Sequence, residues 1–280
     1  MEKPLKYILA EHKLNLKKAF GQNFLTDENL LCEIVEKAGI KDSDTVLEIG
    51  VGAGALTRQL AKCAKRVVGY EIDNRLKLVL NETLFGFHNV EIVFKDVMKE
   101  TISDLEKSLG GEYKIVANLP YYITTPIVMN FLENAKNLTA MAIMVQEEVA
   151  ARFSAAPASS DYGAITVAIN LRGGAKTILK VPREKFTPVP NVDSAVVKID
   201  IEKDKFAGAD LKAVRDCVRA GFSSRRKMLV NNLINGLQLT RVQAETALNQ
   251  AGVPITARGE TLSALDFVKL SESVKAVRNG

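Results

Sequence analysis

The sequence predicts an α/β fold: a doubly wound, mostly parallel sheet of seven strands, followed by a small helical domain. Short runs rich in β-branched residues recur through the first 200 residues, and stretches of helical periodicity follow or separate the first five. Such alternation is typical of a parallel sheet with helices on both faces. After Ile201 the composition changes to polar and then helix-forming residues. The seven runs are Thr45–Ile49, Val67–Glu71, Val90–Phe94, Lys114–Asn118, Ala140–Val145, Ile165–Leu171 and Ala195–Ile201.

The last two runs, Ile165–Leu171 and Ala195–Ile201, have no obvious long helix between them. Gly173-Gly174 and a proline-rich loop separate them instead, which predicts an antiparallel pair at one edge of the sheet. Ligands of doubly wound sheets bind beyond the carboxyl ends of the strands. We therefore expect the functional site at that end of the sheet.

The domain boundary is predicted at residue 205. The polar segment 202–208 is typical of a linker, and helix-forming residues continue through 225–237 and 241–250, with a short last helix after them. The predicted domains are residues 1–205, which include a basic N-terminal segment, and an all-helical domain of residues 206–280.

The composition is that of a soluble globular protein, with 47% hydrophobic and 25% charged residues. No apolar run approaches the roughly 18–20 residues that span a bilayer, and charges occupy the place where a signal peptide is apolar. We therefore expect a cytoplasmic protein with no membrane partner. Three scattered cysteines and two histidines argue against a disulfide framework and against a metal centre. No long exposed apolar face is evident, which predicts a monomer.

The net charge of +5 is unevenly distributed along the chain. Residues 206–280 contain 11 Lys/Arg and 6 Asp/Glu, whereas the first 205 residues contain 27 of each. Residues 1–20 carry five lysines against two glutamates. This asymmetry indicates a polyanionic partner, and a solvated basic surface is the alternative.

The segment after the first predicted strand is a glycine-rich turn containing Gly50, Gly52 and Gly54. Glycines permit positive φ angles and let a ligand approach the backbone closely. Glu71 follows Gly50 by 21 residues, a spacing that suits hydrogen bonds to ribose hydroxyls. Asp96 ends the third strand, where we expect it to meet the amino group of an adenine. The alternatives are a tight turn without a ligand and, for Asp96, a helix N-cap.

The turn favours S-adenosylmethionine over NAD as the cofactor. A pyrophosphate prefers a G-x-G-x-x-G turn at a helix N-terminus, and Ala53 and Ala55 leave that pattern only in a relaxed form. Glu48 places a negative charge beside the turn, which suits a cationic sulfonium better than a phosphate. We predict contacts to S-adenosylmethionine from Gly50 and Gly52. A nicotinamide-dependent dehydrogenase is the disfavoured alternative.

The candidate reaction centre is Asn118-Leu119-Pro120-Tyr121, directly after the fourth strand. The N6 amine of adenine is a poor nucleophile because its lone pair is delocalised into the ring. The Asn118 amide oxygen and the Leu119 carbonyl, held by the rigid Pro120, can accept from that amine and aim its lone pair at a methyl group. The Tyr121 ring can stack on the base. A simple turn with an exposed tyrosine is the alternative.

The proline-rich loop before the last strand begins with Phe186. Its prolines fix an extended backbone that would present Phe186 to the opposite face of the base. A base held between two aromatic rings must be unpaired or flipped out of its helix. The alternative is that Phe186 plugs the loop into the core.

Five motifs stand in order along the chain: Phe20–Leu25, Leu47–Gly54, Asn118–Tyr121, Phe186–Ser194 and Gly221–Lys227. Together they resemble the ribosomal RNA small-subunit adenine dimethyltransferases of the KsgA type, and the match extends from about residue 10 to Leu270. The resemblance implies a Rossmann-like methyltransferase sheet. It also implies transfer of four methyl groups to two adjacent adenosines near the 3′ end of 16S ribosomal RNA, with a role in small-subunit biogenesis on the immature 30S particle.

The resemblance also implies cofactor contacts at Asn23 and Leu25, in addition to Gly50, Glu71, Asp96 and Asn118. For Asn23, capping of the helix that starts at Thr26-Asp27 is the alternative.

Related resistance methyltransferases act on large-subunit RNA. They share Gln22–Leu25 and Asn118–Tyr121, so these elements do not separate the two substrates. Gly221–Lys227 and Arg258–Ser263 are similar to the small-subunit branch, from which Gly259 is a minor departure.

The basic residues of the helical domain are candidate RNA contacts. One predicted helix face carries cations at i, i+3 and i+7, and a basic cluster lies just beyond it. We predict that this face holds RNA phosphates without reading the base sequence. A ribosome-assembly factor that binds without catalysis is the rival hypothesis. The residues are Lys212, Arg215, Arg219, Arg225, Arg226 and Lys227.

Overall fold

A computed structural model describes residues 7–8 and 24–279. The chain divides into two compact units. The sheet unit comprises residues 1–150 and 175–201, and the helical unit comprises residues 151–174 and 202–280. This division differs from the boundary predicted at residue 205, because residues 151–174 pack with the C-terminal helices rather than with the sheet.

The strands of the described residues form a seven-stranded sheet in the order β4-β3-β2-β5-β6-β9-β7. The five strands from β4 to β6 in this order run parallel, and β9 runs antiparallel to β6. This is the predicted doubly wound α/β architecture. Its strands are β2 (Thr45–Ile49), β3 (Arg66–Tyr70), β4 (Val90–Val93), β5 (Tyr113–Asn118), β6 (Leu138–Gln146), β7 (Gly173–Val181) and β9 (Ser194–Ile201).

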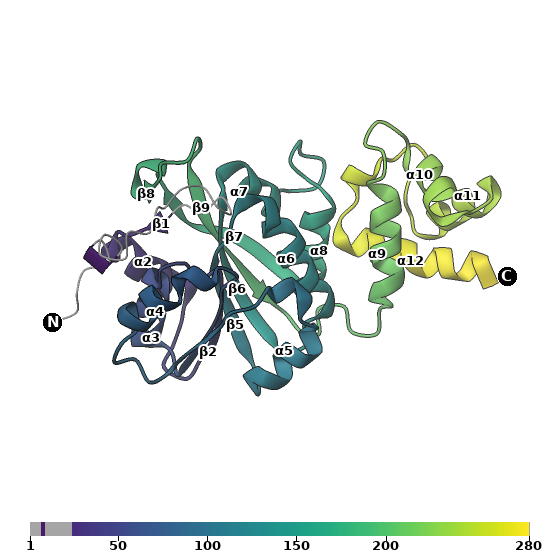
Figure 1. The fold of residues 1–280 in the computed structure, drawn as a ribbon. Helices are drawn as coiled ribbons and strands as arrows, with labels where there is room; N and C mark the ends of the chain where they lie inside the picture. Colours follow the sequence, from purple (N-terminus) through teal and green to yellow (C-terminus); the bar gives the residue numbers. More distant parts are fainter. Residues whose placement is uncertain (1–6, 9–23, 280) are drawn as a thin grey trace. The chain divides into compact units, whose positions relative to one another are not determined.

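Helices cover both faces of the sheet, with α2 and α3 on one side and α5 and α6 on the other (Figure 1). The central strands are therefore almost continuously apolar, and Leu47, Ile115 and Ile143 have no exposed surface. The helices are α2 (Glu28–Ala38), α3 (Ala55–Cys63), α4 (Lys77–Thr83), α5 (Ile102–Leu109), α6 (Tyr121–Asn134) and α7 (Glu147–Phe153). Short 3₁₀ turns occupy Asn74–Leu76, Val97–Lys99 and Arg183–Lys185, and β1 (Phe24–Leu25) pairs with β8 (Phe186–Thr187) in a separate ribbon.

The predicted strand Ile165–Leu171 is wrong. These residues form helix α8 (Ala164–Arg172), and the neighbour of β9 in the sheet is instead β7, which begins at Gly173. Most of the helix is buried, and a helix that is buried all round lacks the 3.6-residue alternation by which helices are recognised. Its β-branched residues then imitate a strand.

The helical unit also contains α9 (Leu211–Gly221), α10 (Leu229–Leu237), α11 (Arg241–Gln250) and α12 (Ala264–Asn279). Helix α12 has 16 residues, so the last helix is longer than predicted. Tyr162, Phe222 and Phe267 form the aromatic centre of this unit, with successive ring centroids 6.1 and 6.0 Å apart. The Tyr162 hydroxyl donates to the Leu262 carbonyl over 2.9 Å. Residues 151–174 thus supply part of the core of this unit.

Two backbone segments approach each other closely in the helical unit. A Cβ added to Gly259 would lie 2.4 Å from the carbonyl oxygen of Gly221, so glycine is required there. The buried Asn232 side chain donates to the same Gly221 carbonyl over 2.9 Å and to the Ser224 carbonyl over 3.0 Å. The departure noted at Gly259 is therefore a packing requirement of this chain.

Among the described residues, no helix is long and apolar enough to cross a membrane. The same part of the chain contains no cluster of three or more His, Cys, Asp or Glu side chains suited to a metal ion.

Candidate active site at the switch point of the sheet

The direction of winding changes between β2 and β5. The chain runs from β2 outward to β3 and β4, and then returns to β5 on the other side of β2. Doubly wound sheets bind ligands in the crevice beyond the carboxyl ends of the strands at such a switch point. A pocket opens there, and its lining includes the predicted cofactor residues Leu25, Gly50, Gly52, Glu71, Asp96 and Asn118. Asn23 lies outside the described residues.

The glycine turn brings the backbone close to its neighbours. Gly50 and Gly52 have φ angles of +78° and +57°, in the left-handed region that favours glycine. A Cβ on Gly50 would lie 3.5 Å from the Asn118 carbonyl oxygen, and one on Gly52 would lie 3.4 Å from the Phe24 ring. The Gly50 N–H donates to the Tyr70 carbonyl over 2.9 Å, and the Gly52 N–H donates to Glu71 over 2.7 Å. Both donors are thus engaged within the protein, which argues against a pyrophosphate at this turn.

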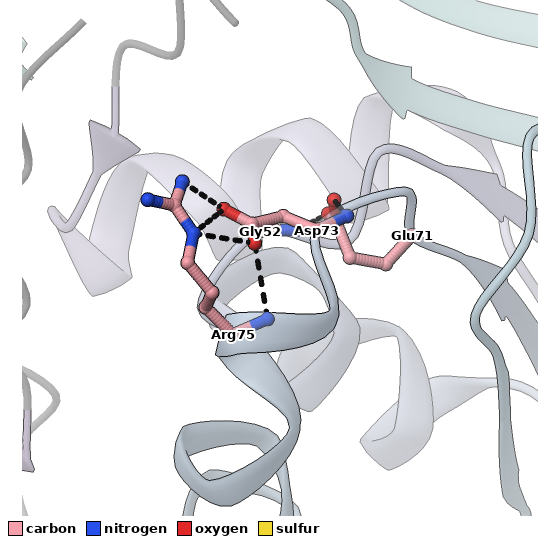
Figure 2. A network of polar contacts seen from close by, with 4 residues as sticks. All are labelled: Gly52, Glu71, Asp73 and Arg75. Carbon is pink, nitrogen blue, oxygen red and sulfur yellow. Dashed lines mark hydrogen bonds and ion pairs between the residues drawn. The ribbon is translucent and has the colours of Figure 1, made fainter. Parts of the chain in front are cut away.

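A small network fixes Glu71 at the end of β3 (Figure 2). Its two oxygens accept from the backbone N–H groups of Gly52 and Asp73, over 2.7 and 2.8 Å. Asp73 in turn accepts from the Arg75 guanidinium, whose closest contact is 2.6 Å, and this partner lowers the pKa of Asp73. Burial raises the pKa of Glu71, and the backbone donors oppose that rise. Each carboxylate oxygen has a second lone pair, so Glu71 is held in place and can still accept from a ligand hydroxyl.

Asp96 caps a short turn and lines the pocket as well. Its side chain caps the turn Val97–Lys99 by accepting from the Met98 N–H over 3.0 Å, and it also lines the pocket. This hydrogen bond fixes the Asp96 carboxylate just beyond the carboxyl end of β4.

Glu48 is the most deeply buried acid of the pocket, with 1% of its surface exposed. Burial raises the pKa of its carboxyl to about 8; the Thr57 hydroxyl opposes this rise and the nearby Glu71 carboxylate adds to it. Without a ligand, burial therefore favours the neutral acid over the carboxylate at Glu48.

Asn118 ends β5, and Pro120 is the N-cap of α6. Leu119, Pro120 and Tyr121 line the same pocket as the glycine turn. The Tyr121 hydroxyl and the Ser194 hydroxyl lie 2.8 Å apart, within hydrogen-bonding distance, so the ring is tied to the first residue of β9. The structure thus brings the predicted reaction centre and the predicted cofactor edge together.

Phe186 occupies a different position from the one predicted. It is 2% exposed, packs in the same apolar cluster as Leu25, and does not line the pocket formed by the described residues. Pairing of Leu25 with Phe186 in the β1–β8 ribbon explains this burial. In this structure Phe186 plugs the loop into the core, which was the alternative to an aromatic partner for the base.

Several pocket residues were not identified from the sequence. Phe24 meets the glycine turn, and Ile72, 49% exposed, places an apolar side chain directly after Glu71. Lys95 and Met144 also line the pocket. An isoleucine directly after Glu71 was the available signal for Ile72. Phe24 stands between Asn23 and Leu25 in the Phe20–Leu25 motif, but its contact with the glycine turn depends on a two-residue strand paired with a distant loop.

The predicted RNA contacts lie in the helical unit and fall into two groups. Lys212 and Arg219 are exposed on α9, with Arg215 half-buried between them, and Arg226 and Lys227 are exposed after it. Arg225 is exposed as well, and its guanidinium also donates to the backbone carbonyl of Tyr162. It therefore contributes to the fold of the unit.

Comparison with known proteins points to one family. The family model described as ribosomal RNA adenine dimethylase matches residues 13–276. The chain is 44% identical to ribosomal RNA small subunit methyltransferase A of Shouchella clausii, over 95% of this chain and 92% of that protein. It is 42% identical to the protein of the same name from Bacillus licheniformis, over 97% and 96% of the two chains.

Two solved structures are similar in fold. A dimethyladenosine transferase from Plasmodium falciparum has a TM-score of 0.73 and 26% identity, covering 88% of this chain and 95% of that one. The 23S rRNA methyltransferase ErmE has a TM-score of 0.69 and 30% identity, covering 90% and 100%. The predicted family and fold class are thereby confirmed. With its glycine turn, its strand-end acids and its Asn118–Tyr121 motif in one pocket, the chain belongs to the ribosomal RNA adenine dimethylase family.

Proposed function

We propose that this protein uses S-adenosylmethionine to form N6,N6-dimethyladenosine at two adjacent adenosines near the 3′ end of small-subunit ribosomal RNA. The observation that carries the proposal is the position of Asn118–Tyr121. These residues follow the strand next to the glycine turn and line the same pocket. Membership of the dimethylase family supports the reaction, and the relatives named small subunit methyltransferase A support the substrate.

The chemistry of the pocket fits S-adenosylmethionine. In this proposal Glu71 and Asp96 accept from ribose hydroxyls and an adenine amino group, and Ile72 packs against the base; all three line the pocket. The N–H groups of Gly50 and Gly52 already donate within the protein. A buried oxygen of Glu48 has no hydrogen-bond partner among the described residues, which suits a positively charged ligand. S-adenosylmethionine supplies the electrophilic methyl carbon when bound.

Asn118 and Leu119 activate the substrate amine in this proposal. Their two carbonyl oxygens accept from the N6 hydrogens and orient the lone pair for in-line attack, so positioning contributes most of the rate. The Tyr121 ring, held by Ser194, stacks on the base. No general base is needed before transfer, because the nitrogen becomes cationic as it attacks and then loses its proton readily. After the first transfer one hydrogen is left on the amine, so one acceptor suffices for the second.

The helical unit binds the RNA backbone in this proposal. Lys212, Arg219, Arg226 and Lys227 are exposed, and such cations contact phosphates without reading sequence. The partner is the immature 30S particle, and the protein takes part in small-subunit biogenesis.

The test is transfer of label from S-adenosylmethionine to 30S particles that lack the modification. We expect labelled dimethyladenosine in the small-subunit RNA, and far slower labelling with Asn118→Ala. Cofactor binding without transfer to any ribosomal RNA would instead leave a pure assembly factor.

Large-subunit RNA is the second candidate substrate, because ErmE, a 23S rRNA methyltransferase, is 30% identical over 90% of this chain. Parallel assays on unmodified large subunits separate the two. Label in the large-subunit RNA alone would overturn the substrate and keep the reaction.

A further inference from the structure

Glu48 is a buried acid of the pocket with an incomplete set of hydrogen bonds. Its carboxyl lines the pocket, has 1% exposure, and carries an oxygen with no hydrogen-bond partner among the described residues. A buried carboxylate without a partner is costly, whereas the neutral acid is tolerated. A ligand that brings a positive charge into the pocket reverses this preference, because the opposite charge stabilises the carboxylate.

The topology places Glu48 nearer to the reaction centre than the other two pocket acids. Glu48 lies on β2 opposite Val116 of β5, two residues before Asn118. Glu71 and Asp96 follow β3 and β4, which are one and two strands farther from β5. A methyl group transferred at Asn118 must be attached to a charged atom close to it. Glu48 comes from the strand adjacent to the one that ends in Asn118, whereas Glu71 and Asp96 follow strands farther from it.

The strands on either side of Glu48 place no charged residue opposite it. Its register neighbours Val116 and Gly69 are uncharged, and Thr57 comes from α3. Glu71 is the charged group that acts on its pKa. The titratable side chains that share the pocket with Glu48 are Tyr70, Glu71, Lys95, Asp96, Tyr121 and Tyr122.

We propose that Glu48 discriminates the cationic sulfonium of the methyl donor from the neutral thioether product, by binding the first as a carboxylate and the second as a carboxylic acid. Binding of the donor then releases one proton from Glu48. During the reaction the carbon–sulfur bond breaks as the carbon–nitrogen bond forms, the amine afterwards loses one proton, and Glu48 takes one up because the positive charge has left the sulfur. This inference rests on the proposed function and concerns how the same pocket exchanges product for donor.

The pH dependence has a definite sign. Without a ligand the pKa of Glu48 is about 8, so donor binding is linked to proton release below that pH. Affinity for the donor should rise by up to roughly tenfold per pH unit as the pH approaches 8, and level off above it. Affinity for the thioether should not rise over the same range, because Glu48 stays protonated when the thioether binds.

The experiment is titration calorimetry of the full chain at pH 7 with S-adenosylmethionine and with S-adenosylhomocysteine. Repeating each titration in two buffers of different protonation enthalpy gives the number of protons released. Both ligands have the same amino-acid end, so the difference between them reports the sulfonium. We expect S-adenosylmethionine to release close to one proton more than S-adenosylhomocysteine in the wild type.

The matched variants are Glu48→Gln and Asp96→Asn, each a neutral isostere. Glu48→Gln should reduce the proton difference to zero and make the affinity ratio of the two ligands independent of pH. Asp96→Asn should keep the proton difference. Equal proton release by the two ligands in the wild type would overturn the proposal and leave the cofactor assignment intact; the wild-type measurement decides even if a variant fails to fold. Failure of both ligands to bind would overturn the cofactor assignment itself.

Discussion

Glycines at two places in this molecule have opposite packing roles. In the sheet unit, Gly50 and Gly52 adopt positive φ angles and line an open pocket, into which they project no side chain. In the helical unit, Gly259 lets its backbone press against the Gly221 carbonyl, and no space remains there. A glycine within a family motif thus indicates close approach, and the structure determines whether a ligand or another backbone approaches.

The same contrast separates the charged residues of the two units. Glu48, Glu71 and Asp96 all line the pocket. All three residues of the Arg225-Arg226-Lys227 cluster are exposed, and Arg225 also donates a hydrogen bond to the Tyr162 carbonyl. We expect substitutions in the pocket to change activity at constant stability, and those at the packed motif to change stability first.

Among the substitutions that test this contrast, the largest effect is expected at Asn118. Asn118→Ala removes one of the two acceptors for the substrate amine and should lower kcat by roughly 10²–10³-fold, as loss of one preorganised hydrogen-bonding group does. Single-turnover methylation of 30S particles measures it, with thermal unfolding as the check on the fold. Asn134→Ala, at the exposed end of α6, is the matched control and should keep wild-type kcat. Equal losses in both would remove Asn118 from the reaction centre.

Gly259→Ala tests the packed side of the comparison. The new methyl group would lie 2.4 Å from the Gly221 carbonyl oxygen, so the two segments must separate. Overpacking of this kind costs about 1–3 kcal/mol of unfolding free energy, which denaturant titration measures. Gly163→Ala, where an added Cβ meets nothing within 4 Å, is the control in the same unit. A Gly259→Ala protein as stable as the control, but with weaker binding of S-adenosylmethionine, would contradict the packing role.

The sheet and the pocket could largely be predicted from the sequence, because each depends on local patterns. The strand-end positions of Glu71, Asp96 and Asn118 follow from hydrophobic runs, and a parallel sheet then gathers them at one edge. Helix α8 could not be predicted, since burial of most of its residues removes its periodicity. The burial of Phe186 could not be predicted either, because it depends on pairing with Leu25, far away in the sequence.

Charge spacing had a similar limit in the helical unit. The basic cluster suggested one function for Arg225, Arg226 and Lys227, whereas the exposed Arg225 side chain also hydrogen-bonds to the Tyr162 carbonyl. Sequence spacing gives the number of cations, and only the structure shows which of them also bond within the protein.

Separate substitutions within the basic cluster test whether its members have different roles. Arg226→Ala with Lys227→Ala should weaken RNA binding and reduce the slope of log K against log salt by roughly 1–2, because about two phosphate contacts are lost. The unfolding free energy of this double variant should not change.

Arg225→Ala should instead lower the unfolding free energy by about 1–2 kcal/mol, through loss of its charge-assisted hydrogen bond. Filter binding over a salt series and denaturant titration measure the two effects. An unchanged salt slope in the double variant would rule out phosphate binding by this pair.

The smallest effect is expected at the hydrogen bond between Tyr121 and Ser194, which joins the stacking ring to β9 over 2.8 Å. Tyr121→Phe keeps the ring for stacking but removes the bond, so kcat should fall only severalfold, whereas Tyr121→Ala also loses stacking worth roughly 1–3 kcal/mol. Ser194→Ala removes the same bond from the other side, and the Tyr121→Phe/Ser194→Ala double variant should be little worse than either single one. The resulting coupling energy should be about 1 kcal/mol in unfolding measurements. Strictly additive effects would mean that the bond does not hold the ring, and the pocket would then position the base through Asn118 and Leu119 alone.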